Sequence, residues 1–130
     1  MVILAGGLGT RLARELKGKP KLMAPIDGKP YLDFAVRWLR YFGANRIVLA
    51  LGHLAAEIET YVDAHSYNGV EIICVVEQEP LGTAGGLAHA CGAVCSDQIL
   101  VMIGDSFVDA DLCALLENHC SSRVDGTLLC

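Results

Sequence analysis

The sequence predicts an α/β domain in which a mainly parallel sheet is covered by helices. Short apolar runs of strand length alternate with helical stretches along the whole chain, and this alternation is typical of parallel sheets. Of the 130 residues, 53% are hydrophobic and 19% are charged, a composition that excludes disorder. A chain of this length is expected to be one domain or a piece of one, residues 1–130, with a core that needs no metal or disulfide support.

The first elements are separated by glycines. Val2 to Ala5 is a short apolar run that predicts a strand ending at Gly6. Thr10 is expected to cap a short helix that continues to about Lys17. A glycine and a proline follow this helix and end it.

The clearest helix is predicted between Pro30 and Gly43. Proline suits the first turn of a helix, and glycine suits the position just past its end. An apolar stripe with helical spacing lies between them, at Tyr31, Phe34, Ala35, Trp38, Leu39 and Phe42. We therefore expect the aromatic side chains of this helix to lie in the core.

Three strands and two helices follow, and the chain then begins another strand. Strands are expected at Arg46–Leu51, Val70–Val76 and Ile99–Ile103, helices at about Leu54–His65 and Asp109–His119, and the start of a last strand within Gly126–Cys130. Asp109 is the expected cap of the last helix.

The charge and hydropathy patterns exclude several classes of protein. A net charge of −5 without a run of Lys or Arg argues against nucleic-acid binding. No apolar stretch of about 18 residues lacks a charge or a glycine, so no membrane-spanning helix is expected. Gly6, Gly7 and Arg11 interrupt the N-terminal apolar run, which argues against a signal peptide. We therefore expect a cytoplasmic protein.

Neither the cysteines nor the histidines show the spacing of a metal site. No pair of the six cysteines forms C-x-x-C, the usual half of a structural zinc site. Reduced, mostly buried thiols are expected, and a single disulfide is the alternative. Each of the four histidines is expected on a helix surface or in a loop, at His53, His65, His89 and His119.

Three clusters of glycine and polar residues follow predicted strands. They are Gly6–Arg11, Glu77–Gly86 and Gly104–Asp111. An open parallel sheet binds ligands outside the carboxyl ends of its strands. The three clusters should therefore share one edge of the sheet and form a binding site there.

The first cluster is a glycine turn between a strand and a helix. Such turns let backbone N–H groups approach phosphate oxygens, although a simple tight turn is the alternative. The dinucleotide-binding pattern requires a third glycine where Leu12 stands, and a Walker-type loop fails because Gly18-Lys19 is followed by Pro20. The glycine turn alone therefore does not identify a ligand.

The wider pattern resembles the signature of the sugar-phosphate nucleotidylyltransferases. The matching segments are Gly6-Gly7-x-Gly9-Thr10-Arg11-Leu12, Lys19-Pro20-Lys21, Met23-x-Pro25-Ile26, Glu79-Pro80-Leu81-Gly82-Thr83-Ala84-Gly85 and Gly104-Asp105-Ser106. The guanylyltransferases that act on mannose or heptose 1-phosphate are the most similar members. The resemblance implies a Rossmann-like, three-layer αβα fold. It also implies a reaction in which a nucleoside triphosphate and a sugar 1-phosphate give an NDP-sugar and pyrophosphate.

The resemblance also implies roles for individual residues. Arg11 would hold the β- and γ-phosphates that leave as pyrophosphate, and Lys21 would reach the α-phosphate and the incoming sugar phosphate. Asp105 would bind Mg²⁺ next to the α-phosphate. The expected nucleotide contacts are Leu4, Ala5, Gly6, Gly7, Gly9, Thr10, Glu77, Gly82 and Thr83.

Each of these roles has a simpler alternative. Arg11 and Lys21 could be solvated cations, and Asp105 an ordinary turn aspartate. A carboxylate at Glu77 could accept hydrogen bonds from guanine N1–H and N2–H, which favours GTP. The alternative is that Glu77 points to water and that the backbone alone sets base specificity. Asp109 and Asp111 are expected to cap the following helix rather than to bind metal.

The resemblance covers only the N-terminal half of the family's fold. Its members are longer, and their later half carries the sugar-binding strands and a second metal-binding aspartate. Two hypotheses follow: a nucleotidylyltransferase shown incomplete or completed by another chain, and a non-catalytic nucleotide-binding or assembly module derived from one. An apolar strand edge near Gly126–Cys130 and a mean hydropathy of +0.43 predict a homodimer or a larger oligomer.

Overall fold

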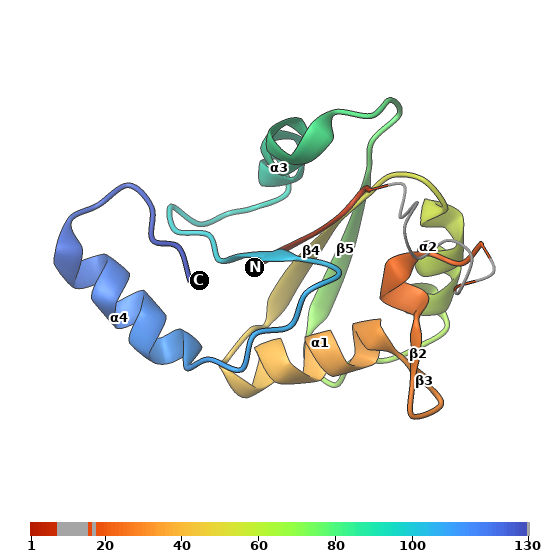
Figure 1. Cartoon of the computed structure of the whole chain (residues 1–130), viewed down its shortest axis with the longest axis horizontal. Helices are drawn as coiled ribbons and strands as arrows, with labels where there is room; N and C mark the ends of the chain where they lie inside the picture. The colour runs from red at the N-terminus through yellow and green to blue at the C-terminus, as the bar shows by residue number, and fades with distance from the viewer. Residues whose placement is uncertain (8–15, 17, 130) are drawn as a thin grey trace.

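The computed structural model describes residues 1–7, 16 and 18–129, and its centre is a four-stranded parallel sheet (Figure 1). The strand order is β5-β4-β1-β6. The bounds are β1 Val2–Ala5, β4 Arg46–Leu51, β5 Glu71–Val76 and β6 Val101–Ile103. All three pairings are parallel, so every strand ends at the same edge of the sheet. The predicted α/β class with a mainly parallel sheet is confirmed.

Helices cover both faces of this sheet (Figure 1). Their bounds are α1 Tyr31–Tyr41, α2 Ala55–Asp63, α3 Gly82–Cys91 and α4 Leu112–Ser122. Side chains alternate between the two faces along each strand. On β1, Ile3 packs with the α1 and α2 side chains, whereas Val2 packs with the α3 side chain Ala90. The domain therefore has three layers.

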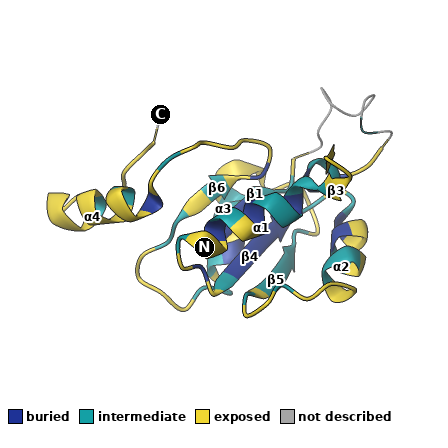
Figure 2. Cartoon of the chain, turned by 90° about the horizontal axis from the view of Figure 1, so that it is seen from below, coloured by how far each residue is buried: buried dark blue, intermediate teal, exposed yellow. Residues whose placement is uncertain are grey.

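Burial is deepest at the centre of the sheet, where β4 lies between two strands and two helical layers. The five residues from Ile47 to Leu51 are all buried, as are four positions on the inner side of α1 (Figure 2). Each fully buried aliphatic side chain stabilises the fold by about 1.5–3 kcal/mol. Figure 2 also shows that α4 lies to the side and is largely exposed. None of the described helices is long and apolar enough to cross a membrane.

The apolar stripe of α1 is rotated from the one expected. The buried residues are Leu32, Ala35, Val36 and Leu39, so the aliphatic positions face the sheet. Tyr31, Trp38 and Phe42 flank this stripe and are only partly buried, and Tyr41 is exposed. Trp38 packs edge-on against Phe107 from the loop after β6, with ring centroids 5.1 Å apart. The aromatics therefore fasten that loop to α1 rather than fill the centre of the core.

A short connection links the N-terminal region to α1. It contains a 3₁₀ turn, η1 (Lys21–Met23), and a small antiparallel hairpin made of β2 (Pro25–Ile26) and β3 (Lys29–Pro30). Pro30 stands just before the helix, as its N-terminal flanking residue. The expected helix over Thr10–Lys17 falls in a region that is largely outside the described residues.

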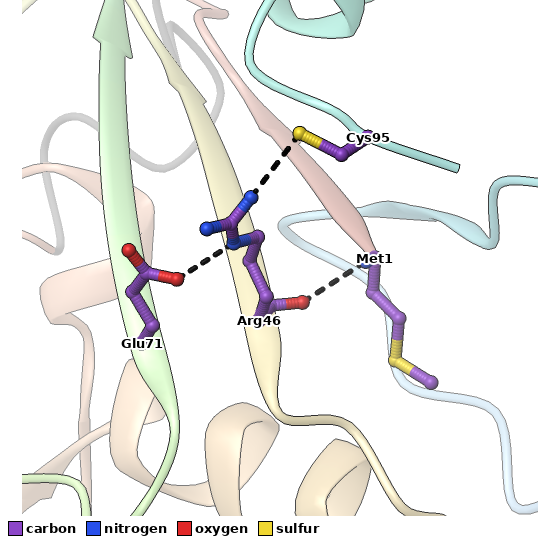
Figure 3. Close-up of polar contacts among 4 residues, drawn as sticks. All are labelled: Met1, Arg46, Glu71 and Cys95. Atoms are coloured by element: carbon purple, nitrogen blue, oxygen red, sulfur yellow. Dashed lines mark hydrogen bonds and ion pairs between the residues drawn. The ribbon is translucent and has the colours of Figure 1, made fainter.

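Polar contacts join the amino ends of three strands, opposite the edge where the strands end (Figure 3). The Met1 ammonium donates to the carbonyl oxygen of Arg46 at 3.0 Å. The Arg46 guanidinium donates to Glu71 Oε2 at 2.6 Å and to Cys95 Sγ at 3.4 Å. These contacts tie β1, β4, β5 and the loop before β6 together at this end.

The strand predicted in the C-terminal region is wrong. Residues 126–129 form no strand, and Leu128 is 89% exposed. The segment instead turns back toward α4, where Thr127 Oγ1 lies 3.0 Å from His119 Nδ1. Of the two aspartates expected to cap the last helix, Asp111 is confirmed, because its carboxylate accepts from the N–H groups of the second and third residues of α4 at 2.9 and 3.2 Å. Asp109 does not cap the helix.

Free thiols are present at the five described cysteines, but the expectation that they are mostly buried is wrong. Cys95, Cys113 and Cys120 are exposed, whereas Cys74 and Cys91 are partly buried. Burial raises the pKa of the Cys74 thiol to about 11, with a smaller contribution from nearby carboxylates. The thiolate of Cys74 is therefore scarce at neutral pH.

Candidate functional site

The carboxyl ends of all four strands open into a cavity of about 290 Å³. The residues that line it come from the three clusters predicted at one edge of the sheet and from η1, α3 and all four strands. They include nine of the twelve predicted site residues: Leu4, Ala5, Gly6, Gly7, Lys21, Glu77, Gly82, Thr83 and Asp105. The other three, Gly9, Thr10 and Arg11, lie outside the described residues.

Glycines allow the strand ends to approach one another closely at this edge. A Cβ atom on Gly52, directly after β4, would lie 2.8 Å from the carbonyl oxygen of Gly6. A Cβ atom on Gly104, after β6, would lie 2.9 Å from the carbonyl oxygen of Leu4, which accepts the Gly104 N–H at 2.8 Å. Side chains at these positions would push the strand ends apart and deform the cavity.

Glu77 follows β5 and lies in a cradle made by glycines. A Cβ atom on Gly6 or Gly52 would meet its Oε1 atom at 2.8 or 2.7 Å, and one on Gly86 would lie 3.6 Å from Oε2. Oε2 also accepts the Leu81 N–H at 3.2 Å, so the carboxylate satisfies a backbone donor just before α3. The side chain therefore lines the cavity wall instead of pointing away into water.

Lys21 and Asp105 form an ion pair across the cavity, although 84 residues separate them in the chain. Ser106 Oγ donates to the other carboxylate oxygen, Oδ1, at 3.1 Å. The hydrogen bond from Lys21 lowers the pKa of Asp105, and desolvation partly opposes this effect. About a third of each side chain is exposed, and ion pairs of this kind contribute only about 0–1 kcal/mol. A ligand can therefore replace the contact at little cost.

Tyr31 holds the loop after β6 against the start of α1. Its hydroxyl donates to the carbonyl oxygen of Ser106 at 2.9 Å. Desolvation, with a smaller effect of the nearby Asp105 carboxylate, raises the pKa of Tyr31, so the hydroxyl stays protonated as the donor. This contact fixes the backbone that carries Asp105.

One face of α3 lines the cavity through Gly82, Thr83, Gly86 and His89. These residues recur with helical spacing and lie on one side of the helix. Gly82 has φ +68°, a conformation that glycine adopts without steric cost.

Three features of the site were not predicted from the sequence: α3, Gly52 and His89. Three glycines in ten residues give α3 a low intrinsic helix propensity, so its packing on the sheet decides its conformation. A glycine directly after the strand at 46–51 was the available signal for Gly52. His89 stands seven residues after Gly82. This spacing places both residues on one face of a helix, but the helix itself was not predicted.

Two carboxylates line the cavity, Glu77 after β5 and Asp105 after β6 at the opposite edge of the sheet, so a metal ion would contact one of them. No group of three or more His, Cys, Asp or Glu side chains gathers anywhere in the described part of the chain. Mg²⁺ is usually held by one or two carboxylates together with substrate phosphates and water. Asp105, at the cavity and with a lowered pKa, fits that kind of site, in which the substrate supplies the other ligands.

The sheet, its glycine-lined carboxyl edge and the cavity there define a Rossmann-like α/β domain with a candidate ligand site at the ends of its strands. The chain belongs to the family described as the MobA-like NTP transferase domain, which matches residues 1–129. The predicted relationship to the nucleotidylyltransferases and the Rossmann-like fold are thereby confirmed.

Relatives with curated names are sugar-phosphate nucleotidylyltransferases. The D-glycero-alpha-D-manno-heptose 1-phosphate guanylyltransferase of Aneurinibacillus thermoaerophilus is 38% identical over 127 residues, which cover 98% of this chain and 55% of that protein. The mannose-1-phosphate guanylyltransferase of Mycobacterium tuberculosis is 37% identical over 127 residues, which cover 98% of this chain and 35% of that protein.

Solved structures show the same arrangement. HddC from Yersinia pseudotuberculosis, complexed with GMP-PN, superimposes with a TM-score of 0.83 at 36% identity, over 91% of this chain and 52% of that chain. The present chain thus spans about half the length of HddC and of the heptose 1-phosphate enzyme, and about a third of the mannose-1-phosphate enzyme.

Proposed function

We propose that this domain binds a nucleoside triphosphate, with GTP preferred, and takes part in nucleotidyl transfer to a sugar 1-phosphate. The products would be an NDP-sugar and pyrophosphate. The observation that carries the proposal is the convergence of Glu77, Lys21 and Asp105 on one glycine-lined cavity at the strand ends. The guanylyltransferase relatives support the same reaction class.

The proposed reaction needs positioning and charge stabilisation rather than a protein nucleophile. An oxygen of the sugar phosphate attacks the α-phosphorus, and the bond between the α-phosphorus and the oxygen that bridges to the β-phosphate breaks, so pyrophosphate leaves with its electron pair. Negative charge then increases on the leaving pyrophosphate. Lys21 would place its ammonium at the α-phosphate and the incoming phosphate, and Arg11 would hold the β- and γ-phosphates.

The ion pair between Lys21 and Asp105 suggests how the site changes when the nucleotide binds. Mg²⁺, when bound, would neutralise phosphate charge, and Asp105 would be its protein ligand. Lys21 would then leave the carboxylate and contact phosphate oxygens. Both charges keep a partner throughout, because each exchanges one partner of opposite sign for another.

Glu77 supports the preference for GTP. Only its Oε2 atom accepts a hydrogen bond from a described backbone group, so Oε1 retains lone pairs for a ligand. Guanine offers two adjacent donors, N1–H and the N2 amino group, to such a carboxylate, whereas uracil and thymine offer one. The Yersinia HddC structure complexed with GMP-PN supports the same preference. Leu4, Ala5, Gly6, Gly7, Gly9, Thr10, Gly82 and Thr83 would supply the remaining nucleotide contacts.

The proposal is tested by measuring binding and turnover separately. Calorimetry with GTP, UTP and dTTP in the presence of Mg²⁺ should give the tightest binding for GTP. Pyrophosphate release is then measured with GTP and either mannose 1-phosphate or heptose 1-phosphate. GTP binding without pyrophosphate would indicate a nucleotide-binding module, and absence of nucleotide binding would overturn the proposal.

A further inference from the structure

His89 is the one histidine of the described residues that lines the cavity. It lies on α3, one turn beyond Gly86 and two turns beyond Gly82, on the same side of the helix. At 1.5 Å per residue, its Cα lies about 10 Å along the helix axis from Gly82. His89 is therefore the last residue of the α3 face that lines the cavity, two turns from Gly82 at the start of the helix.

The imidazole of His89 makes no hydrogen bond to another described residue, whereas two of the other histidines have partners. His65 Nδ1 lies 2.7 Å from the carbonyl oxygen of Tyr61, and His119 Nδ1 lies 3.0 Å from Thr127 Oγ1. His89 is also exposed, so both ring nitrogens are open to a ligand. A neutral imidazole donates with one nitrogen and accepts with the other.

The cavity has two ends with different chemistry. Glu77 follows β5 at one side of the sheet, and Asp105 follows β6 at the other side, where it contacts Lys21. Neighbouring strands lie about 4.8 Å apart, so the two outer strands of this sheet are separated by about 14 Å. In the proposed function, the base lies toward Glu77 and the α-phosphate toward Asp105.

The ribose of such a nucleotide must lie between these ends. The strands there are β4 and β1, and α3 packs over both of them. Gly86 lies beside Glu77, where a Cβ atom would be 3.6 Å from Oε2, so it adds no side chain that would block a sugar next to the base. His89 follows it on the same helix face. Ribose hydroxyls both donate and accept hydrogen bonds, as a neutral imidazole does, whereas the phosphates already have Lys21.

We propose that His89 hydrogen-bonds a ribose hydroxyl of the bound nucleotide and thereby favours ribonucleotides over deoxyribonucleotides. This inference rests on the proposed function, because it requires a nucleotide in the cavity. In this role His89 determines specificity for the ribose of the nucleotide. Removal of the imidazole should therefore change the discrimination between sugars and not the choice of base.

The test compares the affinities of GTP, 2′-deoxy-GTP and 3′-deoxy-GTP by calorimetry, with Mg²⁺ present. One hydrogen bond between neutral groups should make one deoxy analogue bind about 3- to 10-fold more weakly than GTP. The ratio of the dissociation constant of that analogue to the dissociation constant of GTP should fall to about 1 in His89→Leu. The reason is that GTP binding weakens whereas binding of the analogue does not. His89→Gln keeps a donor and an acceptor and should retain part of the ratio.

His53→Leu is the matched control, because His53 is exposed and does not line the cavity. It should leave the ratio unchanged. An unchanged ratio in His89→Leu, or an equal loss in His53→Leu, would overturn the role of His89 while GTP binding itself upholds the proposed function. Failure of the unsubstituted chain to bind any of the three nucleotides would overturn the proposed function, and this inference with it.

Discussion

Lys21 and Asp105 form an ion pair. Removal of the charge from one side chain would therefore leave the other without its partner. Ser106 and Tyr31 fix the loop that carries Asp105 through hydrogen bonds of 3.1 and 2.9 Å. Several contacts determine the position of the Asp105 carboxylate. A substitution that removes only its charge should therefore leave the loop in place.

Asp105→Asn should abolish the enhancement of GTP binding by Mg²⁺ and leave the fold intact. Asparagine keeps the shape of the side chain and removes the negative charge that a hard cation requires. Calorimetric titration of GTP with and without Mg²⁺ measures the effect. Asp109→Asn is the control, because Asp109 lies in the same exposed loop and does not line the cavity. Survival of the Mg²⁺ dependence in Asp105→Asn would make Asp105 a structural residue.

Arg11→Ala should weaken the binding of GTP much more than the binding of GMP. The proposed partners of Arg11 are the β- and γ-phosphates, which GMP lacks, and a hydrogen bond to a charged group contributes about 1.5 to 3 kcal/mol. Calorimetry with both nucleotides measures the difference. Equal losses for GTP and GMP would assign Arg11 to another role.

The strand ends act as a unit because backbone atoms of different strands touch there. Gly52 lies so close to Gly6 and Glu77 that a methyl group would overlap both. The junction between β1 and β4 thus positions the carboxylate as well as the backbone of the first glycine turn. Backbone atoms cannot move aside as the end of a flexible side chain can.

Gly52→Ala should destabilise the domain by about 1–3 kcal/mol, the usual cost of an overpacked site. It should also weaken GTP binding, because the methyl group displaces Glu77. Urea denaturation and calorimetry measure the two effects. Gly126→Ala is the control, since no atom lies within 4 Å of the added methyl group. Wild-type stability of Gly52→Ala would show that the strand ends can separate freely.

The whole domain leaves apolar surface uncovered beside β6. This strand is the edge of the sheet, and Val101 and Ile103 are 39% and 47% exposed although they point to the face that α3 covers elsewhere. Leu128 in the C-terminal segment is also exposed. An edge strand with exposed apolar side chains pairs with another chain or aggregates.

We expect a homodimer that buries this edge, since a symmetric dimer is the commonest way to cover one repeated patch. Light scattering at micromolar concentration should give twice the chain mass of 13.9 kDa. Val101→Lys should give a monomer, whereas Ile26→Lys in the distant hairpin should not (Figure 1). A folded monomer of the unsubstituted chain would contradict the expectation.

The sequence by itself determined the strands and the edge at which the site lies. Apolar runs such as Arg46–Leu51 are bounded by glycine, and polar clusters follow three of them. These signals are local, and the parallel topology brings the clusters together without any further information. The same signals placed Glu77 and Asp105 at this edge, whereas Lys21 was assigned to the site through the resemblance to the nucleotidylyltransferases.

Only the tertiary structure decided how those residues meet. The partner of Lys21 is 84 residues away, and no local pattern encodes such a pair. Packing on the sheet makes a helix of the glycine-rich α3, against its propensity, and so brings His89 into the cavity. Residues 126–129 carry a strand-like pattern but pair with no described strand. A strand requires a hydrogen-bonding partner as well as suitable residues, and only the folded chain determines whether one is present.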